Sequence, residues 1–125
     1  MSKRVLIVDD AVFMRNVIKD IFTAAGFKVI GEASNGLEAV ERYQELKPDL
    51  ITMDIVMPFR SGIEATREII KQDPNAVVLM CSALGQESLV MEAIEAGAMD
   101  FVVKPFRAED VLAVVNKVLD VPPVS

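Results

Sequence analysis

The chain has 125 residues, a length typical of one domain with a buried core. Its hydrophobic content of 52% and charged content of 26% are those of a globular protein and argue against disorder. The formal net charge of −6 argues against a nucleic-acid partner, because phosphate binding needs a basic face.

Residue types that are missing or rare narrow the chemistry further. There is no histidine, which excludes His-based catalytic triads and His-ligated zinc. Cys81 is the single cysteine, so no intramolecular disulfide can form and a reducing compartment is expected. The sequence has no long apolar run and no signal-peptide core, so we expect a soluble, cytoplasmic protein without membrane partners.

The first half of the chain alternates short apolar runs with stretches of helical periodicity. Strands are predicted over residues 3–8, 27–32 and 49–54, the first of them buried on both faces. The first predicted helix begins at Val12 and stops at Gly26, with an apolar face of Val12, Val17, Ile18, Ile21, Phe22 and Ala25. The second runs from Asn35-Gly36 to Pro48, with Leu37, Val40, Tyr43 and Leu46 on one face.

The second half repeats this pattern. A loop with Pro58 and Gly62 precedes a helix whose apolar residues are Ile63, Ala65, Thr66, Ile69 and Ile70. Residues 76–82 predict the most strongly buried strand, followed by a helix over 86–96 and a strand over 101–104. A last helix passes through Val111, Leu112, Val115, Val118 and Leu119. The two prolines in 121–125 prevent that helix from continuing into the tail.

Five strand–helix repeats predict a parallel sheet covered by helices on both sides. We expect one domain over residues 1–120 with a flavodoxin-like, doubly wound α/β fold. Its five strands would take the order 2-1-3-4-5 and be accompanied by five helices. In this architecture ligands bind at the carboxyl ends of the strands, where the strand order reverses.

Polar side chains stand at four of the five predicted strand ends. Asp9 and Asp10 follow strand 1, and Asp54 ends strand 3, so three carboxylates should meet at the expected binding crevice. Ser82 and Lys104 would reach the same edge from strands 4 and 5. Taken singly, each residue has an ordinary explanation, such as a helix cap or a solvated lysine. Together they predict a site.

The chemistry of these groups favours a magnesium ion and a phosphoryl group. Oxygen ligands without His or Cys suit Mg²⁺, Mn²⁺ or Ca²⁺, and Mg²⁺ commonly takes one or two carboxylates with phosphate oxygens. The Lys104 ammonium would add positive charge, and Ser82 could donate to a phosphoryl oxygen. Asp54 is the candidate nucleophile, because aspartate can form an aspartyl phosphate.

The motifs VLIVDD, MDIVMP, MCSA and DFVVKPF occur in this order along the chain. Over residues 4–119 the sequence resembles the receiver domain of two-component response regulators. Within that family, the stretch VDDAVFMRNVIKDI most resembles the chemotaxis members. The resemblance implies a phosphoacceptor that is not a turnover enzyme, although it would phosphorylate and dephosphorylate itself with Mg²⁺. A histidine kinase would be the donor and a flagellar motor switch protein the output partner, with the receiver itself a monomer.

The resemblance also implies a role for individual residues. Asp54 would be the phosphorylated residue and would also bind Mg²⁺, with Lys104 pairing to the phosphoryl group. Asp10 would bind Mg²⁺ directly and Asp9 largely through water. The backbone carbonyl of Val56 would be a third protein ligand. The switch residues would be Ser82 and Phe101, which change the face formed by the last two helices and the fifth strand, and the Lys104–Pro105 peptide would be cis.

The sequence departs from this family in the loop Phe59-Arg60-Ser61, where relatives usually carry methionine in place of Arg60. Phe59 could pack on a partner or wall off the cleft, and Arg60 could pair with an acid, touch phosphate or face water. Alternative interpretations are a sporulation-type relay protein and an engineered, chimeric or divergent receiver scaffold. Less favoured are a small aspartyl-nucleophile phosphatase and a flavodoxin-like cofactor binder.

Overall fold

A computed structural model describes residues 2–120, and within them strands and helices alternate strictly along the chain. The strands are β1 (Arg4–Val8), β2 (Lys28–Ala33), β3 (Leu50–Met53), β4 (Val78–Ser82) and β5 (Asp100–Val103). The helices are α1 (Val12–Ala24), α2 (Gly36–Leu46), α3 (Gly62–Gln72), α4 (Glu87–Glu95) and α5 (Ala108–Leu119). The tail predicted over 121–125 lies outside the described residues.

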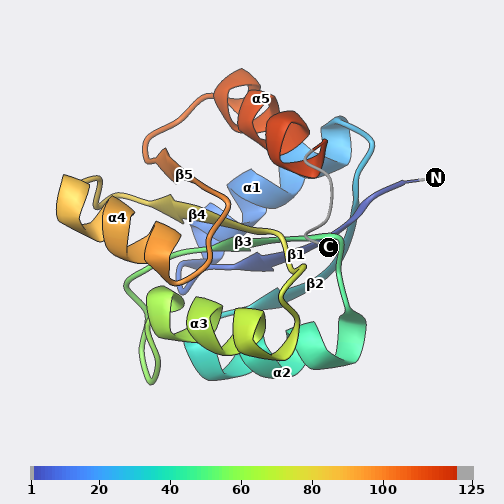
Figure 1. The fold of residues 1–125 in the computed structure, drawn as a ribbon. Coiled ribbons are helices and arrows are strands. Elements are labelled where there is room, and N and C mark those ends of the chain that lie inside the picture. The colour runs from blue at the N-terminus through green and yellow to red at the C-terminus, as the bar shows by residue number, and fades with distance from the viewer. Residues whose placement is uncertain (1, 121–125) are drawn as a thin grey trace.

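All described strand pairs are parallel, and the strand order is β2-β1-β3-β4-β5, as predicted. Figure 1 shows α1 and α5 on one face of the sheet and α2 and α3 on the other. Parallel strands end at one edge, so the segments that follow β1, β3, β4 and β5 lie together there. This edge holds the predicted site.

Two apolar clusters hold the helices against the sheet. One joins the sheet to α2, α3 and α4, and the other joins it to α1 and α5. In the second cluster Phe22 is fully buried and meets Phe27 edge to face, with ring centroids 5.2 Å apart. Burial on both faces explains why the central strands read as continuous apolar runs.

The predicted elements are all present, but several details of burial were wrong. Val12 and Leu37 were expected on buried helix faces, yet they are 61% and 42% exposed, because each stands in the first turn of its helix. Ala25 is also exposed, and α1 already ends at Ala24. Met14, which the periodicity did not single out, packs against the core instead.

Strand bounds shift by one or two residues from those predicted. For example, β5 spans Asp100–Val103, so Lys104 lies just after the strand. β4 is buried at every position, but β3 is buried at every position too, so the prediction that residues 76–82 form the single most buried strand was wrong: both strands lie in the middle of the sheet and are covered on both faces. Among residues 2–120, no helix is long and apolar enough to cross a membrane.

Candidate functional site

Three aspartates converge where β1 and β3 end. Backbone hydrogen bonds fix their positions: Asp9 N–H donates to the Ala33 carbonyl at 3.1 Å, and Asp54 N–H donates to the Val8 carbonyl at 3.0 Å. One carboxylate oxygen each from Asp9, Asp10 and Asp54 lies within 4.8 Å of the others. The topology therefore forms the acidic cluster that the strand ends predicted.

The two adjacent acids after β1 have different environments. Asp9 is buried, and its Oδ1 accepts a hydrogen bond from Ala11 N–H at 2.9 Å, whereas Asp10 is exposed. Arg15 on α1 donates to the Asp9 backbone carbonyl at 2.6 Å and also pairs with Glu32. The sequence did not predict this contact of Arg15, because nothing in the periodicity of α1 distinguishes Arg15 from a solvated arginine.

Lys104 brings the positive charge into this cluster. Its Nζ lies 2.6 Å from Asp9 Oδ2 and 3.8 Å from Asp54 Oδ2, and its side chain is largely buried. Its backbone N–H donates to the Ser82 carbonyl at 2.9 Å, which ties the ends of β4 and β5 together. The Lys104–Pro105 peptide is cis, as the resemblance implied.

Asp54 sits in a pocket that opposes its ionisation. Burial raises the pKa of the Asp54 carboxyl above its usual value; the Lys104 ammonium lowers that pKa, and the negative charge of Asp9 raises it again. Asp54 Oδ1 accepts a hydrogen bond from Ile55 N–H at 2.8 Å, which favours the ionised form. The net result is a carboxylate that is more basic than usual, which fits the predicted role of Asp54 as a nucleophile.

Ser82 and Phe101 occupy the neighbouring strands. Ser82 is buried at the end of β4, and its Oγ accepts a hydrogen bond from Leu84 N–H at 3.2 Å. That bond leaves the hydroxyl hydrogen available for another acceptor. Phe101 is half-buried and packs against the cluster beneath α2, α3 and α4. Val56 is 60% exposed beside Asp54, and the role of its carbonyl stays a prediction.

The unusual loop after β3 does not fill the cleft. Arg60 forms an ion pair with Glu68 of α3, which is the first of the three roles considered for it. Phe59 is 84% exposed and has a positive φ of 68°. Ser61 caps α3, because its Oγ accepts a hydrogen bond from Glu64 N–H at 3.2 Å.

The donor set fits a hard divalent cation. Octahedral Mg²⁺ bonds oxygen at about 2.1 Å, which places neighbouring ligand oxygens roughly 3 Å apart and opposite ones roughly 4 Å apart. One carboxylate oxygen from each of Asp9, Asp10 and Asp54 lies within 4.8 Å of the others, which is close to these separations. The cluster holds three carboxylates, and the single ammonium of Lys104 contacts two of them, which leaves excess negative charge that a cation would offset.

Comparison with known proteins places these features in a family context. The model of the response regulator receiver domain matches residues 5–116. Chemotaxis protein CheY of Thermotoga maritima is 62% identical over 118 residues, covering 94% of this chain and 98% of that protein. Chemotaxis protein CheY of Bacillus subtilis is 57% identical over 120 residues, covering 96% and 100%.

Solved structures agree with this likeness. The response regulator domain of Thermotoga maritima CheB has a TM-score of 0.91 at 44% identity, covering 98% of this chain and all of that one. A crystal structure of the CheX–CheY–BeF₃–Mg²⁺ complex from Borrelia burgdorferi has a TM-score of 0.91 at 43% identity. It covers 93% of this chain and 88% of the matched one. The likeness extends through every strand that supplies a site residue.

Proposed function

The chain belongs to the response regulator receiver domain family, and on this premise we propose that it accepts a phosphoryl group on Asp54 from a histidine kinase. It is a CheY-like response regulator of chemotaxis, by its likeness to the curated proteins of that name. Its proposed output partner is a flagellar motor switch protein, and its proposed location is the cytoplasm.

The position of Lys104 carries the proposal. Its ammonium contacts the carboxylates of Asp9 and Asp54 at once, although these residues come from three different strand ends. A phosphoryl group bonded to Asp54 would place negative oxygens where this ammonium can stabilise them. A solvated surface lysine would not be held between two buried acids.

The transfer step uses the basicity of Asp54. A carboxylate oxygen donates an electron pair to form a bond to phosphorus, the bond from phosphorus to the donor imidazole breaks, and the imidazole leaves with the electron pair of that broken bond. Bound Mg²⁺ would supply positive charge to the phosphoryl oxygens. Asp9, Asp10, Asp54 and the Val56 carbonyl are the proposed ligands, supported by the acidic cluster and by the Mg²⁺ named in the Borrelia complex. Water would later hydrolyse the acyl phosphate.

Signalling would follow from a shift in conformational populations. A phosphoryl group adds about −1.5 to −2 charge and three acceptor oxygens. Ser82 could give its free hydroxyl hydrogen to one of those oxygens, and Phe101, which is only half-buried, could then turn further inward. The conformer that binds the phosphoryl group better becomes the major one, which changes the face formed by α4, β5 and α5.

A small phosphodonor tests the proposal directly. Acetyl phosphate with Mg²⁺ should add one phosphoryl group, seen by intact-protein mass, and Asp54→Asn should abolish the gain. Lys104→Met should slow the reaction by roughly 100-fold, because it removes charge stabilisation from the transition state. Glu45→Gln, which changes an exposed acid on α2, is the matched control and should react normally. Full labelling of D54N would refute Asp54 as the acceptor.

A further inference from the structure

Phe59 is the most exposed large apolar side chain among the described residues, at 84%, and it stands in the loop between β3 and α3. Its φ of 68° is rare for a bulky residue. The Arg60 N–H donates to the Pro58 carbonyl at 2.8 Å, so Phe59 is the centre of a tight three-residue turn. Backbone strain of this kind persists only where surrounding contacts hold it.

Contacts on both sides of the loop hold this turn. The Arg60 carbonyl accepts a hydrogen bond from Gly36 N–H at 3.1 Å, and the Arg60 guanidinium pairs with Glu68. Gly36 must lack a side chain here, because a Cβ would lie 2.3 Å from the Arg60 carbonyl oxygen. Phe59 is therefore an aromatic group presented to solvent on a pre-organised backbone.

The loop that carries Phe59 also borders the phosphoacceptor. It begins directly after Asp54 and returns to it, with Gly62 N–H donating to the Ile55 carbonyl at 2.8 Å. A Cβ on Gly62 would lie 1.8 Å from the Asp54 carbonyl oxygen. Figure 1 shows the connection between β3 and α3 projecting from the edge of the sheet where β1 also ends. A protein that contacts Phe59 would therefore lie next to the cleft that contains Asp54.

A ridge that carries two cations without ion-pair partners among residues 2–120, Arg67 and Lys71, continues from this loop along α3. It borders an open hollow of about 640 Å³ lined by Arg60, Glu64, Arg67, Glu68, Lys71 and Gln72. Arg60 is engaged by Glu68, but within residues 2–120 no carboxylate lies within 4.0 Å of Arg67 or Lys71. Both are exposed, in a chain whose net charge is −6. This ridge is suited to carboxylates on a partner.

We propose that the β3–α3 loop and the α3 ridge dock the phosphodonor protein, through an acidic surface with an apolar pocket that receives Phe59. The inference rests on the proposed function, since it assumes that a donor must reach Asp54. Pre-organised aromatic anchors contribute most to binding when they enter a partner's pocket, and paired charges mainly raise the rate of encounter. Phe59 supplies the first element, and Arg67 with Lys71 supplies the second.

The test compares two donors on the same variants. One is a chemotaxis histidine kinase autophosphorylated with radiolabelled ATP, and the other is acetyl phosphate, which needs no docking surface. Phe59→Gly tolerates the positive φ but removes the ring. It should lower kcat/KM for the kinase roughly thirtyfold, as loss of a binding hot spot does, and leave the acetyl phosphate rate unchanged. Phe59→Tyr should restore transfer from the kinase.

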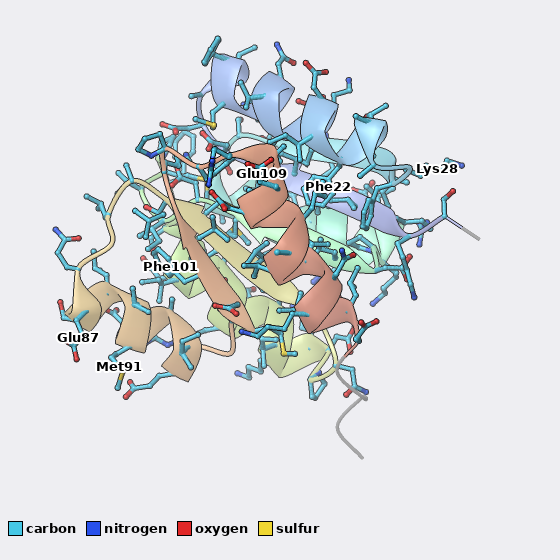
Figure 2. All side chains as sticks on the ribbon, turned by 90° about the horizontal axis from the view of Figure 1, so that it is seen from above. Phe22, Lys28, Glu87, Met91, Phe101 and Glu109 are labelled. Atoms are coloured by element: carbon cyan, nitrogen blue, oxygen red, sulfur yellow. The ribbon has the colours of Figure 1, made fainter. Side chains whose placement is uncertain are left out.

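Charge variants test the ridge separately. The double change Arg67→Glu and Lys71→Glu should slow transfer from the kinase at low salt and flatten its salt dependence. Lys28→Glu is the matched control, because Lys28 is exposed at the start of β2, the opposite end of the strands (Figure 2).

The outcomes separate this inference from the proposed function. If F59G accepts phosphoryl from the kinase as fast as the wild type, docking through Phe59 is wrong. If F59G slows both donors equally, the loop acts on the chemistry and the docking role is also overturned. If K28E slows transfer as much as the ridge variant, general charge explains the steering. Failure of the wild type with both donors would instead refute the proposed function.

Discussion

At Asp54 a carboxylate is held where its charge is unfavourable. It is 8% exposed, and both burial and the neighbouring acid Asp9 raise its pKa. Lys104 offsets only part of this effect, because it lies nearer to Asp9 than to Asp54. Functional sites often lower stability in this way, and replacing the unfavourable group then stabilises the fold.

We therefore expect Asp54→Asn to raise the free energy of unfolding in metal-free buffer at pH 7 by about 0.5–2 kcal/mol. Because the pKa of Asp54 is raised in the folded protein, the folded state binds a proton at Asp54 more tightly than the unfolded chain does. The resulting gain in wild-type stability is complete below the unfolded-state pKa and is lost as pH rises through the folded-state pKa. The difference between D54N and wild type should consequently shrink in acid. Urea unfolding across pH measures it, and a D54N variant less stable than wild type at pH 7 would contradict it.

At the scale of elements, the start of α3 determines how the loop returns to the site. Ser61 caps the helix by accepting a hydrogen bond from Glu64 N–H, and Gly62 allows the chain to pass close to the Asp54 carbonyl. The same turn positions Arg60 to pair with Glu68, which lies about two turns into the helix. The cap thus links helix stability to loop geometry.

Removing this cap should cost about 1 kcal/mol of stability, the usual effect of replacing a serine N-cap with alanine. The variant is Ser61→Ala, measured by chemical unfolding at neutral pH. The matched control is Ser88→Ala, an exposed serine within α4, where alanine has the higher helix propensity and stability should be unchanged or slightly greater. Equal losses in the two variants would show that the Ser61 hydrogen bond contributes nothing.

At the scale of the whole molecule, the sheet is stabilised by separate apolar clusters on its two faces. Phe22 anchors the cluster beneath α1 and α5, where it is fully buried and meets Phe27. This cluster includes Cys81, whose thiol has its pKa raised to about 12 by burial. The cysteine therefore fills the core as an inert thiol.

Phe22→Ala should lower the free energy of unfolding by about 3–5 kcal/mol, because it leaves a cavity in a closed cluster. Phe13→Ala offers a matched control on the same helix, since Phe13 is 77% exposed. Its effect should stay within about 0.5 kcal/mol. Thermal and urea unfolding of both variants would measure the difference in stability. Similar losses of unfolding free energy would contradict the burial of Phe22 and the exposure of Phe13.

The sequence alone determined the alternation of five strands and five helices, and from it the strand order and the edge where Asp9, Asp10, Asp54, Ser82 and Lys104 gather. This succeeded because helical and strand periodicities differ and parallel strands share one carboxyl edge.

The tertiary structure alone decided that Lys104 lies closer to Asp9 than to Asp54 and that Arg15 supports the Asp9 backbone. It also decided that Arg60 pairs with Glu68 while Phe59 faces solvent. Such details depend on strand stagger, loop backbone angles and side-chain rotamers, and these are set by contacts between residues far apart in the chain.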